Sequence, residues 1–300
     1  MSKIHQAIRR AEREGKRNPP ESERRRPAST DPVGTERGGG SKSMAAVVEA
    51  ALDAERWPSA AGPVLPEKRQ SVAFHPDPRV VAISAPRCYA SEQYRALKAR
   101  LYQLREKRLL KTILVTSAAP GEGKTLSSVN LALTIAQEIE ETVLMVDADL
   151  RKPNVHKTLG VPTTQGLADL LNSGSRLDSV LHSTTMTNLF LVQAGTVPEN
   201  PAELLNSQSM RDFLSAASER FDWVILDSPP YLPLADAELM STMVDGILFV
   251  VRASHTPASL VSKSAESLRG KNLLGVIFNG NQGHQQSQYF YNYSYSDTSV

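Results

Sequence analysis

The sequence predicts an α/β fold in which helices cover both faces of a doubly wound, mostly parallel sheet. Three observations predict it. Aliphatic runs of four to five residues recur from residue 112 onward, helix-length stretches separate them, and a glycine-bearing loop follows the first run. Because the runs are apolar on both faces, they suit strands that are covered on both sides. The predicted strands are 112–116, 143–146, 189–192, 223–226, 247–251 and 275–278.

The 300 residues divide into a polar beginning and a folded remainder. Residues 1–70 carry 14 Lys and Arg against 10 Asp and Glu, a net charge of +4, whereas the whole chain has +2. This part cannot bury enough apolar surface to offset the entropy of ordering, so we expect disorder. The predicted organisation is a short basic amphipathic helix at 1–14, a low-complexity linker at 15–78, a folded domain at 79–280 and a flexible tail at 281–300.

Composition argues against several classes of protein. The single cysteine, Cys88, excludes an internal disulfide framework and a cysteine-based zinc site. No apolar run approaches the ~18 residues of a membrane-spanning helix, and no secretory leader follows Met1, so the cytoplasm is the expected compartment. The small net charge gives little reason to expect a nucleic-acid partner.

A helix is expected before the first strand. In the segment 91–101, Tyr94, Leu97 and Leu101 recur at helical spacing, and Ser91 is a suitable capping residue. The segment therefore predicts an amphipathic helix that lies against the domain.

A phosphate-binding loop follows the first strand. The segment 118–125 matches the Walker A pattern, except that Ala118 replaces its first glycine. Loop amides and the following helix N-terminus favour phosphate, Lys124 would bridge the β- and γ-phosphates, and the Thr125 hydroxyl would bind Mg²⁺. The predicted nucleotide-binding residues of the loop are Pro120, Gly121, Glu122, Gly123, Lys124, Thr125 and Leu126.

Carboxylates follow two other predicted strands. Asp227 ends the fourth strand and is the expected Walker B ligand of Mg²⁺, while Asp147 and Asp149 follow the second. Two carboxylates beside a metal can divide their roles, one on Mg²⁺ and one accepting a proton from an attacking hydroxyl. A pair of aspartates that merely caps a helix is the structural alternative.

Tyrosines gather near the end of the chain. Four of the eight tyrosines fall within seven residues, at Tyr289, Tyr291, Tyr293 and Tyr295. Their alternation would also suit a strand, but the flanking residues are polar, and an aromatic terminal strand would invite aggregation. We therefore expect a flexible tail. The nine residues 280–288 let Tyr289 reach roughly 30 Å from the last strand, to its own phosphate site or to a neighbour's.

These motifs together resemble the bacterial tyrosine autokinases (BY-kinases) of capsule and exopolysaccharide assembly, over about residues 75–300. The segment 147–153 is similar to the family's second Walker A motif, 227–230 to its Walker B strand, and the tyrosine cluster to its autophosphorylation tail. The segments 92–98 and 195–205 also match. The opening, residues 1–12, resembles the exosortase-associated type.

The resemblance implies a P-loop NTPase fold with deviant Walker motifs that uses ATP and Mg²⁺ to phosphorylate its own tail tyrosines. It implies a ring-like homo-oligomer and a separate inner-membrane polysaccharide co-polymerase as partner. The protein would be cytoplasmic, held peripherally at the inner face of the membrane by that partner. It would regulate exopolysaccharide or capsule polymerisation and export.

The resemblance also implies roles for particular residues. Asp147 would activate the incoming tyrosine hydroxyl, Asp149 would help to organise the metal, and Arg151 would act as a nearby cation. Asn279 follows the last strand, where related folds read adenine. The predicted catalytic set is Lys124, Asp147, Asp149 and Arg151, the metal set is Thr125, Asp149 and Asp227, and the oligomer contacts are Glu92, Arg95 and Lys98. Lys98 stands where the family has arginine, and lysine does not reproduce a bidentate contact.

Two other functions fit the same loop. A partition- or septum-type switch ATPase shares this fold, but it carries a lysine where this chain has Ala119, and it has no use for a tyrosine tail. A nucleotide-sensing scaffold that performs no chemistry is the other alternative. Phosphotyrosine would separate both of them from a kinase.

Overall fold

The computed structural model describes residues 72–232 and 234–281. The helix predicted at 1–14, most of the predicted linker and the four tyrosines of the tail lie outside these residues. Within the described part, no helix is both long and apolar enough to cross a membrane.

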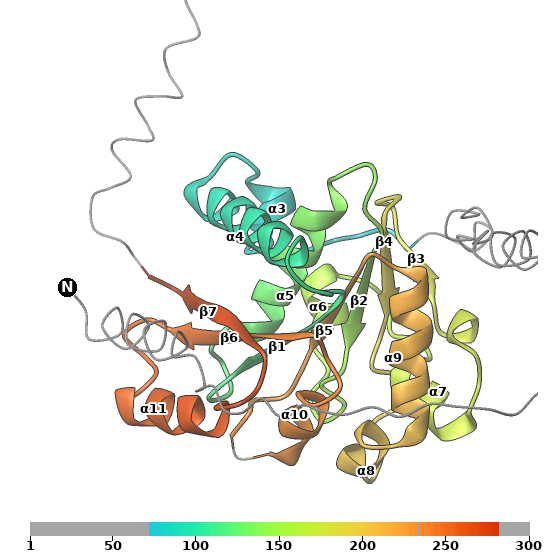
Figure 1. The fold of residues 1–300 in the computed structure, drawn as a ribbon. Coiled ribbons are helices and arrows are strands. Elements are labelled where there is room, and N and C mark those ends of the chain that lie inside the picture. Colours follow the sequence, from blue (N-terminus) through green and yellow to red (C-terminus); the bar gives the residue numbers. More distant parts are fainter. Residues whose placement is uncertain (1–71, 233, 282–300) are drawn as a thin grey trace, which may run out of the picture. The chain divides into compact units, whose positions relative to one another are not determined.

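The predicted sheet is present, with seven strands in the order β3-β4-β2-β5-β1-β6-β7 (Figure 1). All neighbouring strands are parallel except the pair β3 and β4. The strands are β1 (Thr112–Ser117), β2 (Val143–Asp147), β3 (His182–Ser183), β4 (Leu189–Val192), β5 (Trp223–Asp227), β6 (Gly246–Arg252) and β7 (Leu273–Asn279). Only β3 was not predicted, because two residues are too few to show a period.

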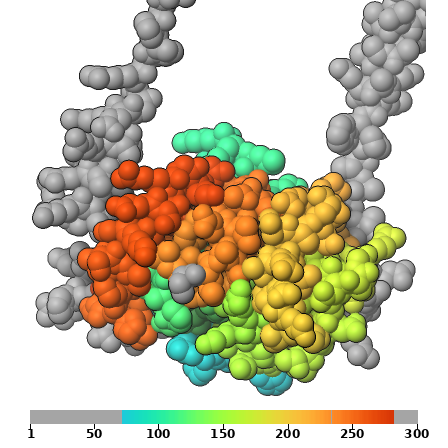
Figure 2. All heavy atoms as spheres, turned by 90° about the horizontal axis from the view of Figure 1, so that it is seen from below, coloured from blue at the N-terminus to red at the C-terminus, as the bar shows by residue number. Residues whose placement is uncertain are grey.

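Helices cover both faces of the sheet, which confirms the doubly wound α/β prediction (Figure 1). Alternate residues of β1 point to opposite layers, Ile113 and Val115 to one and Leu114 to the other. The first layer contains α3 (Val81–Ser84), α4 (Tyr89–Arg105), α5 (Lys124–Ala136) and α6 (Val155–Leu159). The second contains α7 (Leu167–Ser173), η1 (Leu177–Ser179), α8 (Pro201–Leu205), α9 (Gln208–Arg220), α10 (Ala235–Met240) and α11 (Ala258–Ser267). Figure 2 shows the second layer from below, where segments distant in sequence form one continuous surface.

The strand order decides where the site lies. Although β1 and β2 are consecutive among the predicted strands, β5 is hydrogen-bonded between them. The carboxyl ends of parallel strands meet at one edge of a sheet, so the segments that follow β1, β2 and β5 are neighbours. In the β2–β5 ladder, Asp147 and Asp227 are direct partners.

Two features of the ends of the domain differ from the sequence predictions. Burial was expected for the last strand, but Val276 and Phe278 of β7 are each 57% exposed. That expectation is wrong: among the described strands β7 is the last of the sheet and pairs with β6 alone, and alternate side chains of it are exposed. At the other end the folded part begins before residue 79: Val72 bridges to Thr184, and the His75 amide donates to the Leu159 carbonyl.

Candidate nucleotide-binding site

The loop between β1 and α5 has the backbone shape that its glycines allow. Gly121 and Gly123 have φ values of 80° and 92°, a region that other residues rarely adopt. A Cβ on Gly123 would also lie 2.0 Å from Asn279 Nδ2. The loop therefore needs glycine at position 123 for both conformation and space.

Hydrogen bonds from residues at and just after the end of β6 and at the end of β7 hold this loop in place. Glu122 is buried, where its Oε2 accepts the Ala118 amide at 2.8 Å and its Oε1 accepts the Thr256 hydroxyl at 2.5 Å. The Asn279 amide Nδ2 donates to the Glu122 carbonyl at 2.9 Å, and Arg252 Nη1 donates to the Gly121 carbonyl at 3.2 Å. The side chains of Glu122 and Asn279, both predicted to bind nucleotide, thus contact the loop itself. Sequence reasoning missed Thr256 and Arg252, which no local motif marks.

Four of the predicted residues meet at the start of α5. Lys124 Nζ lies 3.1 Å from Asp149 Oδ2, and the Thr125 hydroxyl donates to Asp227 Oδ2 at 2.6 Å. All four side chains are largely buried, with Asp227 fully so. The strand order therefore assembles the lysine, the hydroxyl and the two carboxylates that the sequence motifs predicted separately.

Asp147 lies beside this group and organises the segment after β2. Its Oδ2 accepts the amides of Asn154 and Val155, each at 3.0 Å, and its Oδ1 accepts the Asp149 amide at 3.2 Å. Three backbone donors thus hold the Asp147 carboxylate at the base of the site. The sequence offered two roles for Asp147, holding the backbone amides of a following helix and accepting a proton. One side chain can do both, because Oδ1 accepts only one of the three amides and keeps a lone pair.

Burial and mutual repulsion make this cluster electrostatically unfavourable without a cation. Burial, reinforced by Asp227, raises the pKa of Asp147 to about 8 against the opposing backbone amides. Burial also raises the pKa of Asp227 to about 6, although Lys124 and Thr125 oppose it. The pKa of Lys124 is raised because Asp227 and Asp149 outweigh the effect of its own burial. The site therefore favours additional positive charge.

The residues present fit Mg²⁺. Within the described residues, Asp227 Oδ1 is buried and makes no hydrogen bond, whereas Oδ2 accepts the Thr125 hydroxyl, so this carboxylate keeps an acceptor available. The Ser128 hydroxyl is also near enough to lower the pKa of Asp227. Among the described residues, no group of three or more His, Cys, Asp or Glu could hold a metal by itself. In phosphate loops Mg²⁺ ordinarily takes one or two protein ligands, and phosphate oxygens and water complete the coordination.

Arg151 contacts a residue that the sequence did not single out. Its Nε donates to Asp236 Oδ2 at 2.6 Å and its Nη2 to Asp236 Oδ1 at 3.0 Å. Asp236 lies in the first turn of α10, in a sequence without a recognisable motif. The guanidinium predicted to serve as a nearby cation is therefore engaged by a carboxylate.

The residues predicted for oligomer contacts lie elsewhere, on α4. Glu92 and Arg95 form an ion pair with each other, and Lys98 pairs with Glu138 in the segment after α5. Side-chain exposure of 44% for Glu92 and 37% for Arg95 leaves this pair accessible from outside.

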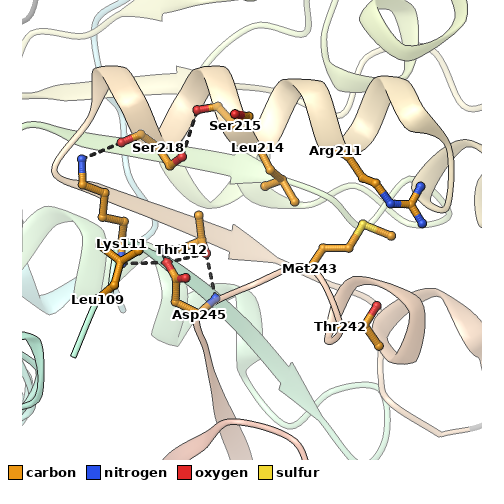
Figure 3. Close-up of a pocket in the computed structure, with 10 residues that line it drawn as sticks. All are labelled: Leu109, Lys111, Thr112, Arg211, Leu214, Ser215, Ser218, Thr242, Met243 and Asp245. Atoms are coloured by element: carbon orange, nitrogen blue, oxygen red, sulfur yellow. Dashed lines mark hydrogen bonds between the residues drawn. The ribbon is translucent and has the colours of Figure 1, made fainter. Parts of the chain in front are cut away.

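A groove of about 390 Å³ lies at the opposite edge of the sheet, and it is not part of the nucleotide site. Figure 3 shows Lys111, Thr112 and Asp245 on one side of it and α9 on the other. Asp245 Oδ2 accepts the amides of Lys111 and Thr112 together with the Thr112 hydroxyl, and the Lys111 ammonium donates to the Ser218 carbonyl. These contacts join the starts of β1 and β6 to α9.

The fold and the loop define a P-loop nucleotide-binding protein. A family model described as an AAA domain matches residues 110–261.

Comparison with known proteins identifies the family within this class. The tyrosine-protein kinase YwqD of Bacillus subtilis (strain 168) is 36% identical over 214 residues, which cover 71% of this chain and 90% of YwqD. The kinase domain of the Escherichia coli tyrosine kinase ETK matches with a TM-score of 0.64 and 33% identity, covering 69% of this chain and 82% of that one. The chimerical protein CapA2B2 matches with a TM-score of 0.64 and 29% identity, covering 69% and 92%. The chain belongs to the family of bacterial tyrosine-protein kinases, which confirms the resemblance drawn from its motifs.

Proposed function

We propose that this protein is an ATP-dependent tyrosine autokinase that phosphorylates Tyr289, Tyr291, Tyr293 and Tyr295 of its own tail. The observation that carries the proposal is the meeting of Lys124, Thr125, Asp149 and Asp227 beside the phosphate loop, in a chain of the tyrosine-kinase family.

The chain's own residues supply most of the chemistry of phosphoryl transfer. The loop amides and Lys124 hold the β- and γ-phosphates and neutralise their charge. Thr125, Asp227 and Asp149 would hold Mg²⁺, which would supply charge stabilisation for the phosphoryl group and the leaving ADP. The tyrosine oxygen bonds to the γ-phosphorus as the bond to the β–γ bridging oxygen breaks. Asp147 accepts the tyrosine proton, for which Oδ1 retains a lone pair.

The start of the tail supports this choice of acceptor. β7 ends at Asn279, whose side chain donates to the phosphate loop at Glu122. The tail therefore starts next to the loop, and Tyr289 follows ten residues later, a reach of roughly 30 Å. This length suits transfer to the chain's own tyrosines or to those of an adjacent copy.

The proposal extends to partners and location. A ring-like homo-oligomer would form through α4, with Glu92, Arg95 and Lys98 exchanging intramolecular ion pairs for contacts with a neighbour. A separate inner-membrane polysaccharide co-polymerase would hold the protein at the cytoplasmic face of the membrane. Through that partner the kinase would regulate capsule or exopolysaccharide polymerisation and export.

Intact-mass spectrometry tests the central claim. Phosphatase-treated protein is incubated with Mg²⁺ and ATP, beside Lys124→Met and a variant with all four tail tyrosines changed to Phe. We expect up to four added phosphates on the wild type, mapping to the tail, and essentially none on either variant. ATP hydrolysis without phosphotyrosine would instead support the switch ATPase. Phosphate retained on the four-Phe variant would exclude the tail as the main acceptor.

A further inference from the structure

An ion pair connects two segments that border the nucleotide site. Arg151 lies in the segment after β2, two residues beyond Asp149, and Asp236 lies in α10, beyond the segment that follows Asp227. Both guanidinium bonds are in place, so the contact fixes the orientation of Arg151 as well as its distance. The pair thus joins the two segments that carry the acidic residues of the site.

The Asp236 side of the contact is buried and lies a few residues beyond two hydrogen bonds to the end of β1. The Tyr231 amide donates to the Ser117 carbonyl at 2.7 Å. The Thr116 hydroxyl donates to the Pro229 carbonyl at 2.9 Å. Asp236 itself is fully buried. Arg151 therefore pairs with a carboxylate that is enclosed by the domain.

The Arg151 side of the contact includes Asp149. Asp149 Oδ1 accepts the Lys152 amide at 3.0 Å, which closes a turn with Arg151 inside it. Its other oxygen, Oδ2, faces Lys124. Fixing Arg151 therefore fixes the turn that aims the Asp149 carboxylate at the phosphate loop.

We propose that the Arg151–Asp236 pair is a positioning clasp that holds Asp149 in place for Mg²⁺ and nucleotide. The proposal rests on the kinase function in giving Asp149 a role at the metal. It makes Arg151 a positioning residue and not a cation that meets the transferring phosphoryl group.

The unequal burial of the two side chains allows a sharp test. Arg151 is 38% exposed and Asp236 is 0% exposed. Water can solvate Arg151 if its partner is neutralised, whereas removing Arg151 leaves a buried carboxylate without its partner. Asp236→Asn should therefore fold normally, Arg151→Met should be unstable, and the double variant Arg151→Met with Asp236→Leu should recover stability.

The experiment measures melting temperature, tail phosphorylation against ATP concentration, and binding of a fluorescent ADP analogue with Mg²⁺ or with EDTA. For Asp236→Asn and for the double variant we expect the Mg²⁺-dependent gain in nucleotide affinity to fall about 10-fold, the size typical of losing a residue that orients a ligand. The phosphorylation rate at saturating ATP should fall by a similar factor. Affinity in EDTA should not change.

The matched control is another Arg–Asp pair, Arg220 and Asp178, which lie 2.5 Å apart and join α9 to η1 away from the site. Asp178→Asn should leave tail phosphorylation per folded molecule and the Mg²⁺-dependent nucleotide affinity unchanged, whatever its effect on melting temperature. If the double variant recovers both stability and wild-type Mg²⁺-dependent binding, the pair is merely structural and the proposal is overturned. If the wild type binds nucleotide with Mg²⁺ but forms no phosphotyrosine, the kinase proposal fails while the binding data still decide on the clasp.

Discussion

Aspartates at the two edges of the same sheet are in opposite situations. At the amino edge, Asp245 accepts three hydrogen bonds on one oxygen, and Asp222 accepts the amide and the hydroxyl of Thr142. At the carboxyl edge, Asp227 Oδ1 is buried and makes no hydrogen bond within the part of the chain that the structure describes, and burial raises the pKa of Asp227 to about 6. Asp222 directly precedes β5 and is half-buried, whereas Asp227 ends the same strand and is fully buried, so the two ends of one strand place a carboxylate in different surroundings.

The difference indicates that the carboxylates at the amino edge stabilise the fold, whereas those at the carboxyl edge serve the nucleotide site. At the amino edge, main-chain amides and threonine hydroxyls satisfy the carboxylates, which then join strand starts together. At the carboxyl edge, buried carboxylates lie close together and raise one another's pKa, an arrangement that costs stability until a cation binds. Substitutions at the two edges should therefore have opposite effects on stability and on activity.

The largest effect is expected at the carboxyl edge. Asp227→Asn should lower tail phosphorylation by roughly 100-fold or more, because a preorganised charge at the reacting group is lost. The same change should raise the melting temperature of the metal-free protein by about 3 to 6 °C at pH 7.5. Asn can still accept the Thr125 hydroxyl, so the fold keeps that contact.

The sign of the stability change follows from the pKa of Asp227. Folding raises this pKa from 3.8 to about 6, so its destabilising contribution develops as the pH rises from 3.8 to 6 and is complete above it. The advantage of Asp227→Asn should therefore disappear below pH 4. Calorimetry in EDTA at several pH values checks this, and a variant less stable than wild type at pH 7.5 would contradict it.

At the amino edge we expect the reverse pattern. Asp245→Ala should lower the free energy of unfolding by roughly 3 kcal/mol, because the amides of Lys111 and Thr112 lose their acceptor. Phosphorylation per folded molecule should stay within about twofold of wild type, because a substitution at the amino edge shares no partner with the nucleotide site and distant sites couple weakly. Urea unfolding and the mass assay measure the two quantities, and a selective loss of phosphorylation would break the comparison.

Binding of Mg²⁺ with nucleotide should relieve the electrostatic repulsion between the carboxylates at the carboxyl edge. Mg²⁺ with ADP at about 100 times its dissociation constant should stabilise the wild type by about 2.7 kcal/mol. Asp227→Asn should show a much smaller gain, whereas Asp245→Ala should keep the full gain from its lower starting point. Equal stabilisation of wild type and Asp227→Asn would argue that Asp227 does not hold the metal.

The smallest expected effect concerns a single hydroxyl at the amino edge. Thr112 Oγ1 donates to Asp245 Oδ2 at 2.9 Å and accepts the Asp245 amide at 2.8 Å. Thr112→Val keeps the shape and should lower the free energy of unfolding by about 1 to 2 kcal/mol. Its effect should largely vanish in an Asp245→Ala background, and full additivity would show that the two residues act separately.

Local signals account for the parts of the site that were predicted. The loop 118–125 combines a preceding strand, glycines and a lysine, and the strands before Asp147 and Asp227 are continuous aliphatic runs. Each signal lies within about ten residues, a length over which sequence patterns report directly on backbone conformation. The burial of β7 was predicted wrongly because an aliphatic run does not reveal whether its strand lies at the edge of the sheet.

Contacts between distant segments could not be predicted in the same way. Thr256 reaches Glu122 across 134 residues, and Asp236 reaches Arg151 across 85. No motif surrounds Asp236 or Thr256, and their partners depend on the order in which strands pair.

The sequence by itself determined the alternation of helices and strands, the phosphate loop and the acidic residues that end β2 and β5, because these depend on short-range periodicity and residue chemistry. The tertiary structure alone decided that β5 lies between β1 and β2. It thereby decided that Asp149 faces Lys124 and that Asp227 faces Thr125 with one oxygen, while its other oxygen makes no hydrogen bond among the described residues. Strand pairing is a non-local competition among similar aliphatic runs, so its outcome is decided by how the whole domain packs.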